Sequence, residues 1–195
     1  MRQAAAEAAR WPEDLRLAIN VSPVQLRHKE FPALVLNVLA GSGLVPRRLE
    51  IEITAPMLVG DLERRRDMLG ALRSLGVRVV LGGSGTGQSS LGDMLSLPFD
   101  RLKLERNLVA AIDTGPNALT IVRAFAALGR ELGVETTADG IETMAQLRAA
   151  HAAGFSEVQG TLMARPMPAD AVRQMLQQAF DRMDELPYRS MQASG

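Results

Sequence analysis

Short apolar runs alternate with longer amphipathic segments along this chain, and this alternation restricts the fold more than any other feature of the sequence. The runs are rich in valine, isoleucine and leucine, whereas the segments between them repeat apolar residues at helical spacing. Strands that alternate with helices in this way form βα units, in which the strands pair in parallel. The sequence predicts six strands, at 17–21, 49–54, 77–81, 101–104, 134–137 and near Val158.

The helical segments carry their own boundary signals. Apolar stripes predict helices over 62–75 and 118–132, and a last amphipathic helix over 169–183. Gly133 and Gly154 stand where glycine commonly ends a helix, because glycine adopts the left-handed conformation at low cost. These signals place the end of a helix shortly before each of the last two predicted strands.

Length and composition indicate a single domain without extreme charge. We expect the domain to span 1–185 and the polar residues 186–195 to form a disordered tail. The 22 basic and 22 acidic residues cancel, so no overall charge favours nucleic acid. Cysteine is absent, which excludes disulfides and favours a cytoplasmic protein. No apolar stretch reaches the roughly 20 residues that a membrane-spanning helix needs.

Six βα units are compatible with two architectures. A closed (β/α) barrel has eight strands, so this chain would supply two strands too few. An open doubly wound sheet accommodates six strands without that deficit. In both architectures the chemistry is expected at the carboxyl ends of the strands.

Polar residues occur at the ends of nearly all the predicted strands. Taken singly, each has a structural explanation, such as a helix cap, a solvated strand position or a turn. Their joint placement is difficult to obtain from packing alone, and it indicates a functional site at the carboxyl edge of the sheet. The residues concerned are Asn20, Glu52, Lys103, Asp139, Glu142 and Gln159.

A glycine-rich turn from Gly82 to Ser90 follows the third predicted strand. Gly82, Gly87 and Ser89 match the spacing of a phosphate-binding loop, in which backbone amides hold phosphate oxygens. Such a loop also needs a lysine that reaches the β- and γ-phosphates, and Gln88 stands in its place. An ATP-binding loop is therefore one hypothesis for this turn, and thermal stabilisation by ATP would support it.

Several motifs that recur in order resemble the EAL domain family of cyclic di-GMP phosphodiesterases, over residues 17–168. The resemblance implies an α/β fold of the modified TIM-barrel type, incomplete at the N-terminus. It also implies that active members hydrolyse cyclic di-GMP to linear pGpG with two Mg²⁺ or Mn²⁺ ions. The motifs are INVSP at 19–23, LEIEIT at 49–54, GTGQSSL at 85–91, RLKLER at 101–106, ADGIET at 138–143 and QG at 159–160.

By this resemblance, the strand-end residues correspond to positions of the family's active site. Asn20 and Glu52 correspond to metal ligands. Lys103 corresponds to the lysine beside the attacking water, and Asp139 replaces a glutamate thought to act in catalysis. Further ligand-binding positions correspond to Gly82, Gly83, Glu142 and Gln159.

The departures from the family pattern concern the residues that hold the metals. Gly82 and Gly83 stand where the family has two aspartates that ligate and bridge the ions, and glycine has no side-chain oxygen. Ala55 replaces a glutamate that anchors a loop, and Glu105 replaces an aspartate. The signature Glu-Ala-Leu is expected upstream of Trp11 and does not occur in this sequence.

We therefore expect a catalytically degenerate EAL-like module in cyclic di-GMP signalling, without a cofactor. It would be a receptor for the dinucleotide or a protein-interaction module, and the missing upstream part of a larger signalling chain is a candidate partner. The alternative is a residual cyclic di-GMP phosphodiesterase that still uses Mg²⁺ or Mn²⁺. Neither hypothesis involves nucleic acid or a membrane segment in this chain.

Overall fold

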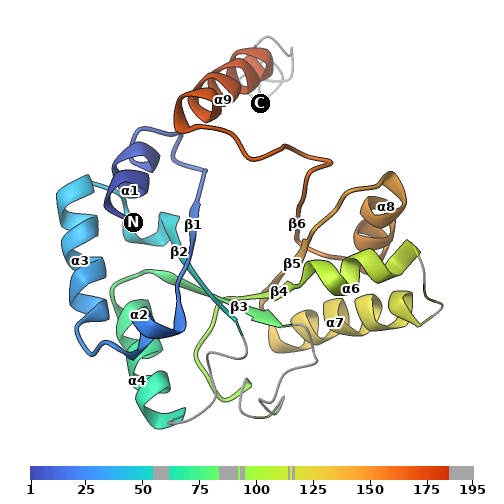
Figure 1. Cartoon of the computed structure of the whole chain (residues 1–195), viewed down its shortest axis with the longest axis horizontal. Coiled ribbons are helices and arrows are strands. Elements are labelled where there is room, and N and C mark those ends of the chain that lie inside the picture. The colour runs from blue at the N-terminus through green and yellow to red at the C-terminus, as the bar shows by residue number, and fades with distance from the viewer. Residues whose placement is uncertain (55–61, 84–91, 93–94, 114, 116, 185–195) are drawn as a thin grey trace, which may run out of the picture.

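A curled sheet of six parallel strands forms the centre of the structure, a computed structural model that describes residues 1–54, 62–83, 92, 95–113, 115 and 117–184 (Figure 1). Each strand pairs with the next one along the chain. A doubly wound sheet would reverse its strand order at a switch point, so this sequential order supports the barrel-like alternative. The strands are β1 (Leu17–Asn20), β2 (Leu49–Thr54), β3 (Arg78–Gly83), β4 (Arg101–Leu104), β5 (Glu135–Asp139) and β6 (Glu157–Gln159).

Helices cover the outside of the curled sheet in two groups (Figure 1). The first group contains α1 (Arg2–Ala8), α2 (Pro23–Arg27), α3 (Phe31–Ser42) and α4 (Leu62–Ser74), and the 3-10 helix η1 (Pro46–Arg48) leads into β2. The second group contains α6 (Arg106–Ala110), the 3-10 helix η3 (Ala111–Asp113), α7 (Ala118–Leu132) and α8 (Met144–Ala153). Among the described residues, no helix is both long and apolar enough to span a bilayer.

The last helix, α9 (Ala169–Asp184), lies apart from both groups and beside α1 (Figure 1). Arg173 of α9 and Glu7 of α1 form an ion pair in which Nη2 and Oε2 are 2.7 Å apart. The hydrogen bonds from Arg173 are the main reason why the pKa of Glu7 lies below its ordinary value. This pair therefore joins the two ends of the described chain.

Alternate residues of the strands face the helices and form the core. Leu49, Ile51 and Ile53 of β2 are fully buried in the cluster under the first group of helices. A second cluster, which includes Val122 and Ile141, lies under the second group. A fully buried side chain of this kind contributes about 1.5–3 kcal/mol to folding. The intervening residues of the same strands are left to face the concave side of the sheet.

Two strands extend further than the sequence predicts. β3 continues through Gly82 and Gly83, and β5 continues to Asp139. The two glycines therefore belong to a strand, whereas a phosphate-binding loop would place Gly82 after the strand. The remainder of the glycine-rich turn (84–90), Ala55 and the predicted tail 186–195 lie outside the described residues.

Glycine ends two of the helices, as predicted. Gly133 ends α7 and Gly154 ends α8, with φ angles of 66° and 86° respectively. Gly160, directly after β6, is required for a different reason. A Cβ atom at this position would lie 2.0 Å from the carbonyl oxygen of Ile141, so the two backbones approach closely enough to exclude a side chain.

Candidate functional site

Side chains from β2, β4, β5 and β6 meet on the concave side of the sheet. Lys103 Nζ donates hydrogen bonds to Glu52 Oε2 at 2.8 Å and to Gln159 Oε1 at 3.0 Å. Asp139 Oδ2 lies 3.5 Å from the same ammonium nitrogen. Strands β2, β4 and β6 are not neighbours, so these side chains converge across the sheet, as residues from alternate strands do inside a (β/α) barrel. We call these four residues the Lys103 cluster.

The Lys103 cluster is buried at its centre and open on one side. The side chains of Lys103 and Glu52 are 10% and 13% exposed, whereas that of Asp139 is 32% exposed. Solvent therefore screens the Lys103–Glu52 pair less than it screens Asp139. One ammonium group thus lies against two carboxylates, and Asp139 is the acidic group that borders the solvent.

A network of six charged side chains lies next to the Lys103 cluster. Arg101, whose side chain is 5% exposed, forms ion pairs with Glu50, Glu135 and Glu157. Because three arginines face three glutamates, the charges are balanced and the network holds the strands together. Its members are Arg16, Glu50, Arg78, Arg101, Glu135 and Glu157.

The network shifts the pKa values of two of its carboxylates in opposite directions. Burial raises the pKa of Glu50 above its ordinary value, although the nearby arginines, chiefly Arg101, act against this effect. Burial acts to raise the pKa of Glu135 as well. Hydrogen bonds from Arg101 and Arg78 outweigh this effect and hold the pKa of Glu135 below its ordinary value. The more exposed glutamate is therefore the one that its partners keep ionised more strongly.

Arg16 joins the two edges of the sheet. It directly precedes β1 and forms an ion pair with Glu157 of β6, the strand at the opposite edge. It also lies 3.4 Å from Glu50 Oε1 of β2. These contacts cross the concave side and hold the sheet in its curled form.

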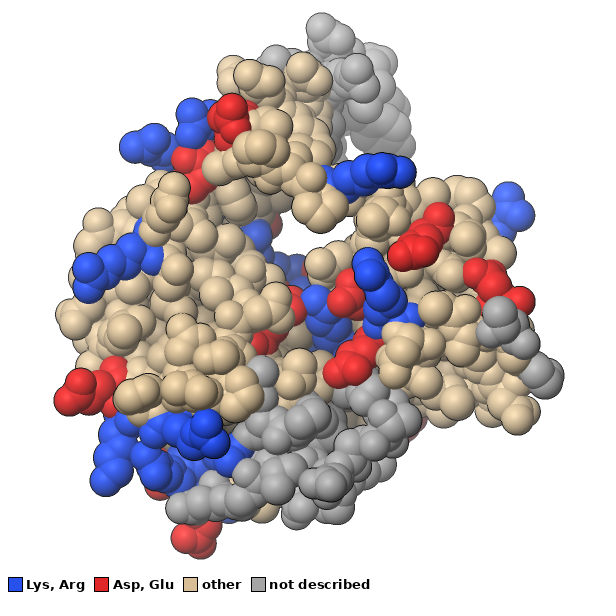
Figure 2. All heavy atoms as spheres, in the orientation of Figure 1, with Lys and Arg blue, Asp and Glu red and all other residues tan. Residues whose placement is uncertain are grey.

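A cavity of about 420 Å³ on the concave side connects the Lys103 cluster with the network. Glu52 and Gln159 line one part of it, and Arg16 and Glu157 line another. Figure 2 shows a hollow in the middle of this face of the molecule, with basic and acidic side chains inside it. Thr137 Oγ1 is buried at this cavity and makes no hydrogen bond to the described residues, so it can bond to a ligand or to water.

Gly82 lies beside the Lys103 cluster, paired in register with Thr54 of β2 and Lys103 of β4. A Cβ atom at Gly82 would meet Ile53 O at 3.5 Å and Glu105 Oε1 at 3.9 Å, which are ordinary contact distances. The position can therefore hold a side chain, and the absence of a carboxylate there is not imposed by packing.

The donors near Gly82 do not fit a pair of divalent ions. The described residues contain no group of three His, Cys, Asp or Glu side chains that could hold a metal ion. Glu52 and Asp139 are the two carboxylates of the cluster, and the ammonium of Lys103 lies against both. Glu105 adds a third carboxylate near Gly82. Two adjacent divalent ions require several further oxygen ligands that bridge them.

Two other predicted site residues lie outside the Lys103 cluster. Asn20 is exposed at the end of β1, where it is paired in register with Glu52. Glu142 is exposed after β5, and its Oε1 lies 3.8 Å from Arg106 Nη2. The strand-end residues thus divide into four that meet at Lys103 and two that face the solvent.

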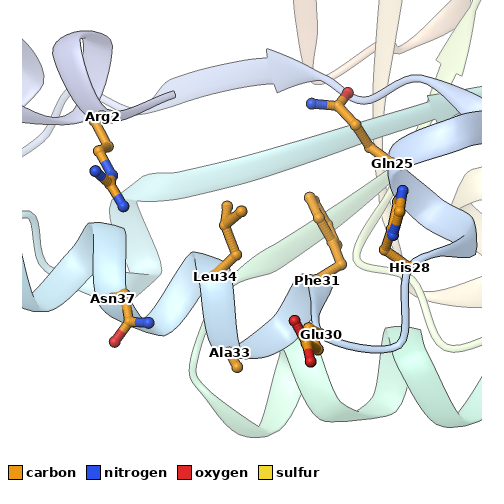
Figure 3. A pocket seen from close by; sticks show the side chains of 8 residues that line it. All are labelled: Arg2, Gln25, His28, Glu30, Phe31, Ala33, Leu34 and Asn37. Atoms are coloured by element: carbon orange, nitrogen blue, oxygen red, sulfur yellow. The ribbon is translucent and has the colours of Figure 1, made fainter.

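A larger cavity, of about 630 Å³, lies on the outside of the molecule between α1, α2 and α3. Figure 3 shows Arg2 at one end of it and Gln25 and His28 at the other, with Leu34 and Phe31 between them. It contains none of the residues of the Lys103 cluster. The larger of these two cavities is therefore not the one that borders the Lys103 cluster.

The charged network was not predicted from the sequence. Arg101 is one of its best buried members, and its position two residues before Lys103 was the available signal, because residues at i and i+2 of a strand share a face. Glu50 and Glu52 show the same spacing on β2. Charges that recur with this spacing on several strands can neutralise one another across the concave side.

The sequence model of the EAL domain matches residues 1–166. An uncharacterized signaling protein of Caulobacter vibrioides is 42% identical over 172 residues, a match that covers 88% of this chain and 21% of the relative. The chain therefore spans about a fifth of the length of that relative.

Two solved structures share the fold. The PaMucR phosphodiesterase, solved as a c-di-GMP complex, is 31% identical and gives a TM-score of 0.83, with 88% of this chain and 71% of that chain covered. BlrP1 of Klebsiella pneumoniae, solved at pH 6 as a manganese and cyclic di-GMP complex, is 27% identical. Its TM-score is 0.74, with 83% of this chain and 42% of that chain covered.

Proposed function

This chain belongs to the EAL domain family of cyclic di-GMP signalling, and we propose that it is a degenerate member, which binds the dinucleotide or a protein partner without hydrolysing it. The observation that carries the proposal is the Lys103 cluster beside Gly82 and Gly83. An ammonium group there pairs with the carboxylates, and two positions where the resemblance implies aspartates have no side chain.

The charge of the site supports a loss of metal binding. Three carboxylates, those of Glu52, Asp139 and Glu105, lie in this region, and Lys103 offsets one of them, so fewer negative charges remain than two divalent ions need. Divalent ions lower the pKa of a bound water from about 15.7 toward roughly 7. A site with too few oxygen ligands to hold such ions generates little hydroxide at neutral pH, so the phosphodiester remains intact.

The same charge supports binding of the dinucleotide. Cyclic di-GMP carries two phosphates, and a site with fewer carboxylates repels them less. Gly82 leaves space beside the cluster, and Gln159 and Thr137 offer uncharged polar groups at the cavity. Because Gly82 lies within the sheet, it contributes space, while the neighbouring side chains contribute the hydrogen bonds.

We also propose that the chain has a protein partner and a cytoplasmic location. The exposed edges of a six-stranded open sheet can pair with further strands, which supports a protein partner. The absence of cysteine supports a cytoplasmic location.

Catalysis is tested by incubating the protein with cyclic di-GMP and Mn²⁺ or Mg²⁺ and separating the products by chromatography. We expect no linear pGpG above the background of a Glu52→Gln variant. Turnover by the wild type that Glu52→Gln abolishes would refute degeneracy and establish the alternative, a metal-dependent phosphodiesterase.

Binding is tested by calorimetry with cyclic di-GMP in the presence of EDTA. Gly82→Asp adds a carboxylate beside the ligand, whereas Gly82→Asn adds a side chain of nearly the same shape without charge. We expect binding by the wild type and at least about fivefold weaker binding by Gly82→Asp than by Gly82→Asn, because the added charge repels the phosphates. Absence of heat with the wild type would refute the receptor function and leave the protein-interaction function.

A further inference from the structure

We propose that Glu157 is a positioning residue of the ligand site, because it holds the edge strand β6 where Gln159 reaches Lys103. Glu157 and Gln159 are two residues apart on β6, so both side chains lie on the concave side of the sheet. Glu157 belongs to the charged network and Gln159 to the Lys103 cluster. Any effect of Glu157 on cyclic di-GMP rests on the function proposed above, whereas its effect on the Lys103 cluster does not.

Polar side chains of the concave side are stacked in two layers with the same arrangement. In each layer, a cation on β4 is held between side chains from β2 and β6. In a (β/α) barrel, alternate strands likewise supply the side chains of one layer. Each member of the second layer follows a member of the first by two positions on the same strand. The first layer contains Glu50, Arg101 and Glu157, and the second contains Glu52, Lys103 and Gln159.

Glu157 holds the edge strand β6 across the concave side. In the described sheet, the backbone of β6 pairs with β5 on one side, and its other side is an edge. Arg101 Nη2 of β4 donates a hydrogen bond to Glu157 Oε1 at 2.9 Å, and Arg16, directly before β1, forms an ion pair with the same carboxylate. The side chain of Arg101 is 5% exposed and is itself held by further glutamates. Glu157 therefore ties a strand at the edge to a fixed group in the middle of the sheet.

The contact that Glu157 positions is a hydrogen bond to an uncharged group. Lys103 Nζ donates to Gln159 Oε1 at 3.0 Å and to Glu52 Oε2 at 2.8 Å. The carboxylate of Glu52 attracts the ammonium over a longer range, whereas the amide of Gln159 binds it through close contact alone. A donor and an acceptor that are 3.6 Å apart no longer form a hydrogen bond. An outward shift of β6 by about 0.6 Å would therefore release Lys103 from Gln159.

Glu135 offers a matched control for Glu157. Its side chain is 39% exposed, compared with 36% for Glu157, and it also pairs with Arg16 and Arg101. It lies on β5, however, whose backbone is paired with β4 on one side and with β6 on the other. Removal of either glutamate takes one negative charge from the network, but of the two only Glu157 holds an edge strand.

The test follows the ammonium group of Lys103 by NMR of the full chain labelled with isotopic lysine. The sequence contains two lysines, Lys29 and Lys103, so the exposed Lys29 serves as an internal reference. In Glu157→Met, hydrogen exchange between the Lys103 ammonium and water should be at least about threefold faster than in Glu135→Met, because Gln159 no longer holds the ammonium. Thermal unfolding shows whether both methionine variants are folded at the temperature of the measurement.

A conservative variant separates positioning from a general loss of structure. Glu157→Gln should restore the exchange of the wild type, because its amide oxygen can still accept a hydrogen bond from Arg101. In calorimetry, Glu157→Met should bind cyclic di-GMP at least about threefold more weakly than Glu135→Met.

The positioning role would be overturned by equal exchange at Lys103 in the two methionine variants, or by equal affinities for cyclic di-GMP. Failure of Glu157→Gln to restore the exchange would overturn it as well. Absence of heat with the wild type would instead refute the receptor function. The exchange measurement needs no ligand, so it would still decide whether Glu157 positions the Lys103 cluster.

Discussion

Replacement of Lys103 by methionine removes the charge at the centre of the site while keeping most of the side-chain volume. At an effective dielectric constant of about 20, a unit charge attracts another by about 6 kcal/mol at the 2.8 Å that separates Lys103 from Glu52. The attraction to Asp139 at 3.5 Å is about 5 kcal/mol on the same scale. Desolvation of the charged groups offsets most of this attraction in the folded protein.

Lys103→Met lowers the free energy of unfolding because it leaves two carboxylates without their counter-ion. Removing one partner of a fully buried pair costs about 3–5 kcal/mol. Because Asp139 is about a third exposed, solvent screens part of the uncompensated charge. We therefore expect the free energy of unfolding to fall by about 2–3 kcal/mol at pH 7.

Urea unfolding followed by circular dichroism measures this loss. A double variant, Lys103→Met/Glu52→Gln, should be more stable than Lys103→Met alone, because it removes the better buried of the two unpaired carboxylates. Arg123→Met, on the exposed surface of α7, serves as the control and should change stability by no more than about 0.5 kcal/mol. A loss below about 0.5 kcal/mol for Lys103→Met, or a double variant that is less stable still, would refute the role of Lys103 as counter-ion.

Two further predictions concern the fold. Gly160→Ala should destabilise by more than about 3 kcal/mol in thermal unfolding, because its Cβ would clash with Ile141 O, whereas Gly41→Ala in α3, with no atom within 4 Å of its added Cβ, should be neutral or stabilising. Equal effects of the two glycine variants would contradict the backbone clash. Because the pKa of Glu7 is held below the ordinary 4.5, its pair with Arg173 stabilises the α1–α9 contact above that pH and loses this effect as the pH falls through the lowered pKa. In the wild type, the protection factors of the α9 amides, corrected for the intrinsic pH dependence of exchange, should therefore fall at acid pH. In Glu7→Gln they should be independent of this titration, and a fall that persists in the variant would assign it to another group.

The sequence predicted the sheet well because its strands are marked by apolar residues. A run such as 49–54 buries every second side chain against helices, and this leaves an alternating apolar pattern in the sequence. The meeting of Glu52, Lys103 and Gln159 was also predictable in outline, since parallel strands bring their carboxyl ends to one edge. The hydrogen bonds between these three side chains could not be predicted, because they depend on how strongly the sheet curls.

α2 and α3 are among the helices that were not predicted, and they were missed for different physical reasons. α3 (Phe31–Ser42) is apolar on several faces, with Leu34 and Leu36 about half exposed, so its sequence shows no clear stripe. α2 is short, and its signal is the reciprocal capping of Ser22 and Gln25 rather than an apolar period. Propensity and periodicity describe long amphipathic helices best, and neither helix is one.

The sequential strand order has a consequence for how the chain acquires its structure. Each βα unit pairs with the unit made just before it, so the sheet can grow in the direction of synthesis, with each loop closed over a short stretch of chain. The contacts of Arg16 with Glu157, 141 residues away, and of Glu7 with Arg173, 166 residues away, can form only after nearly all of the chain exists. Curling of the sheet would then be a late event, and a nascent chain that stops before β6 would hold its strands paired while its concave side is still open.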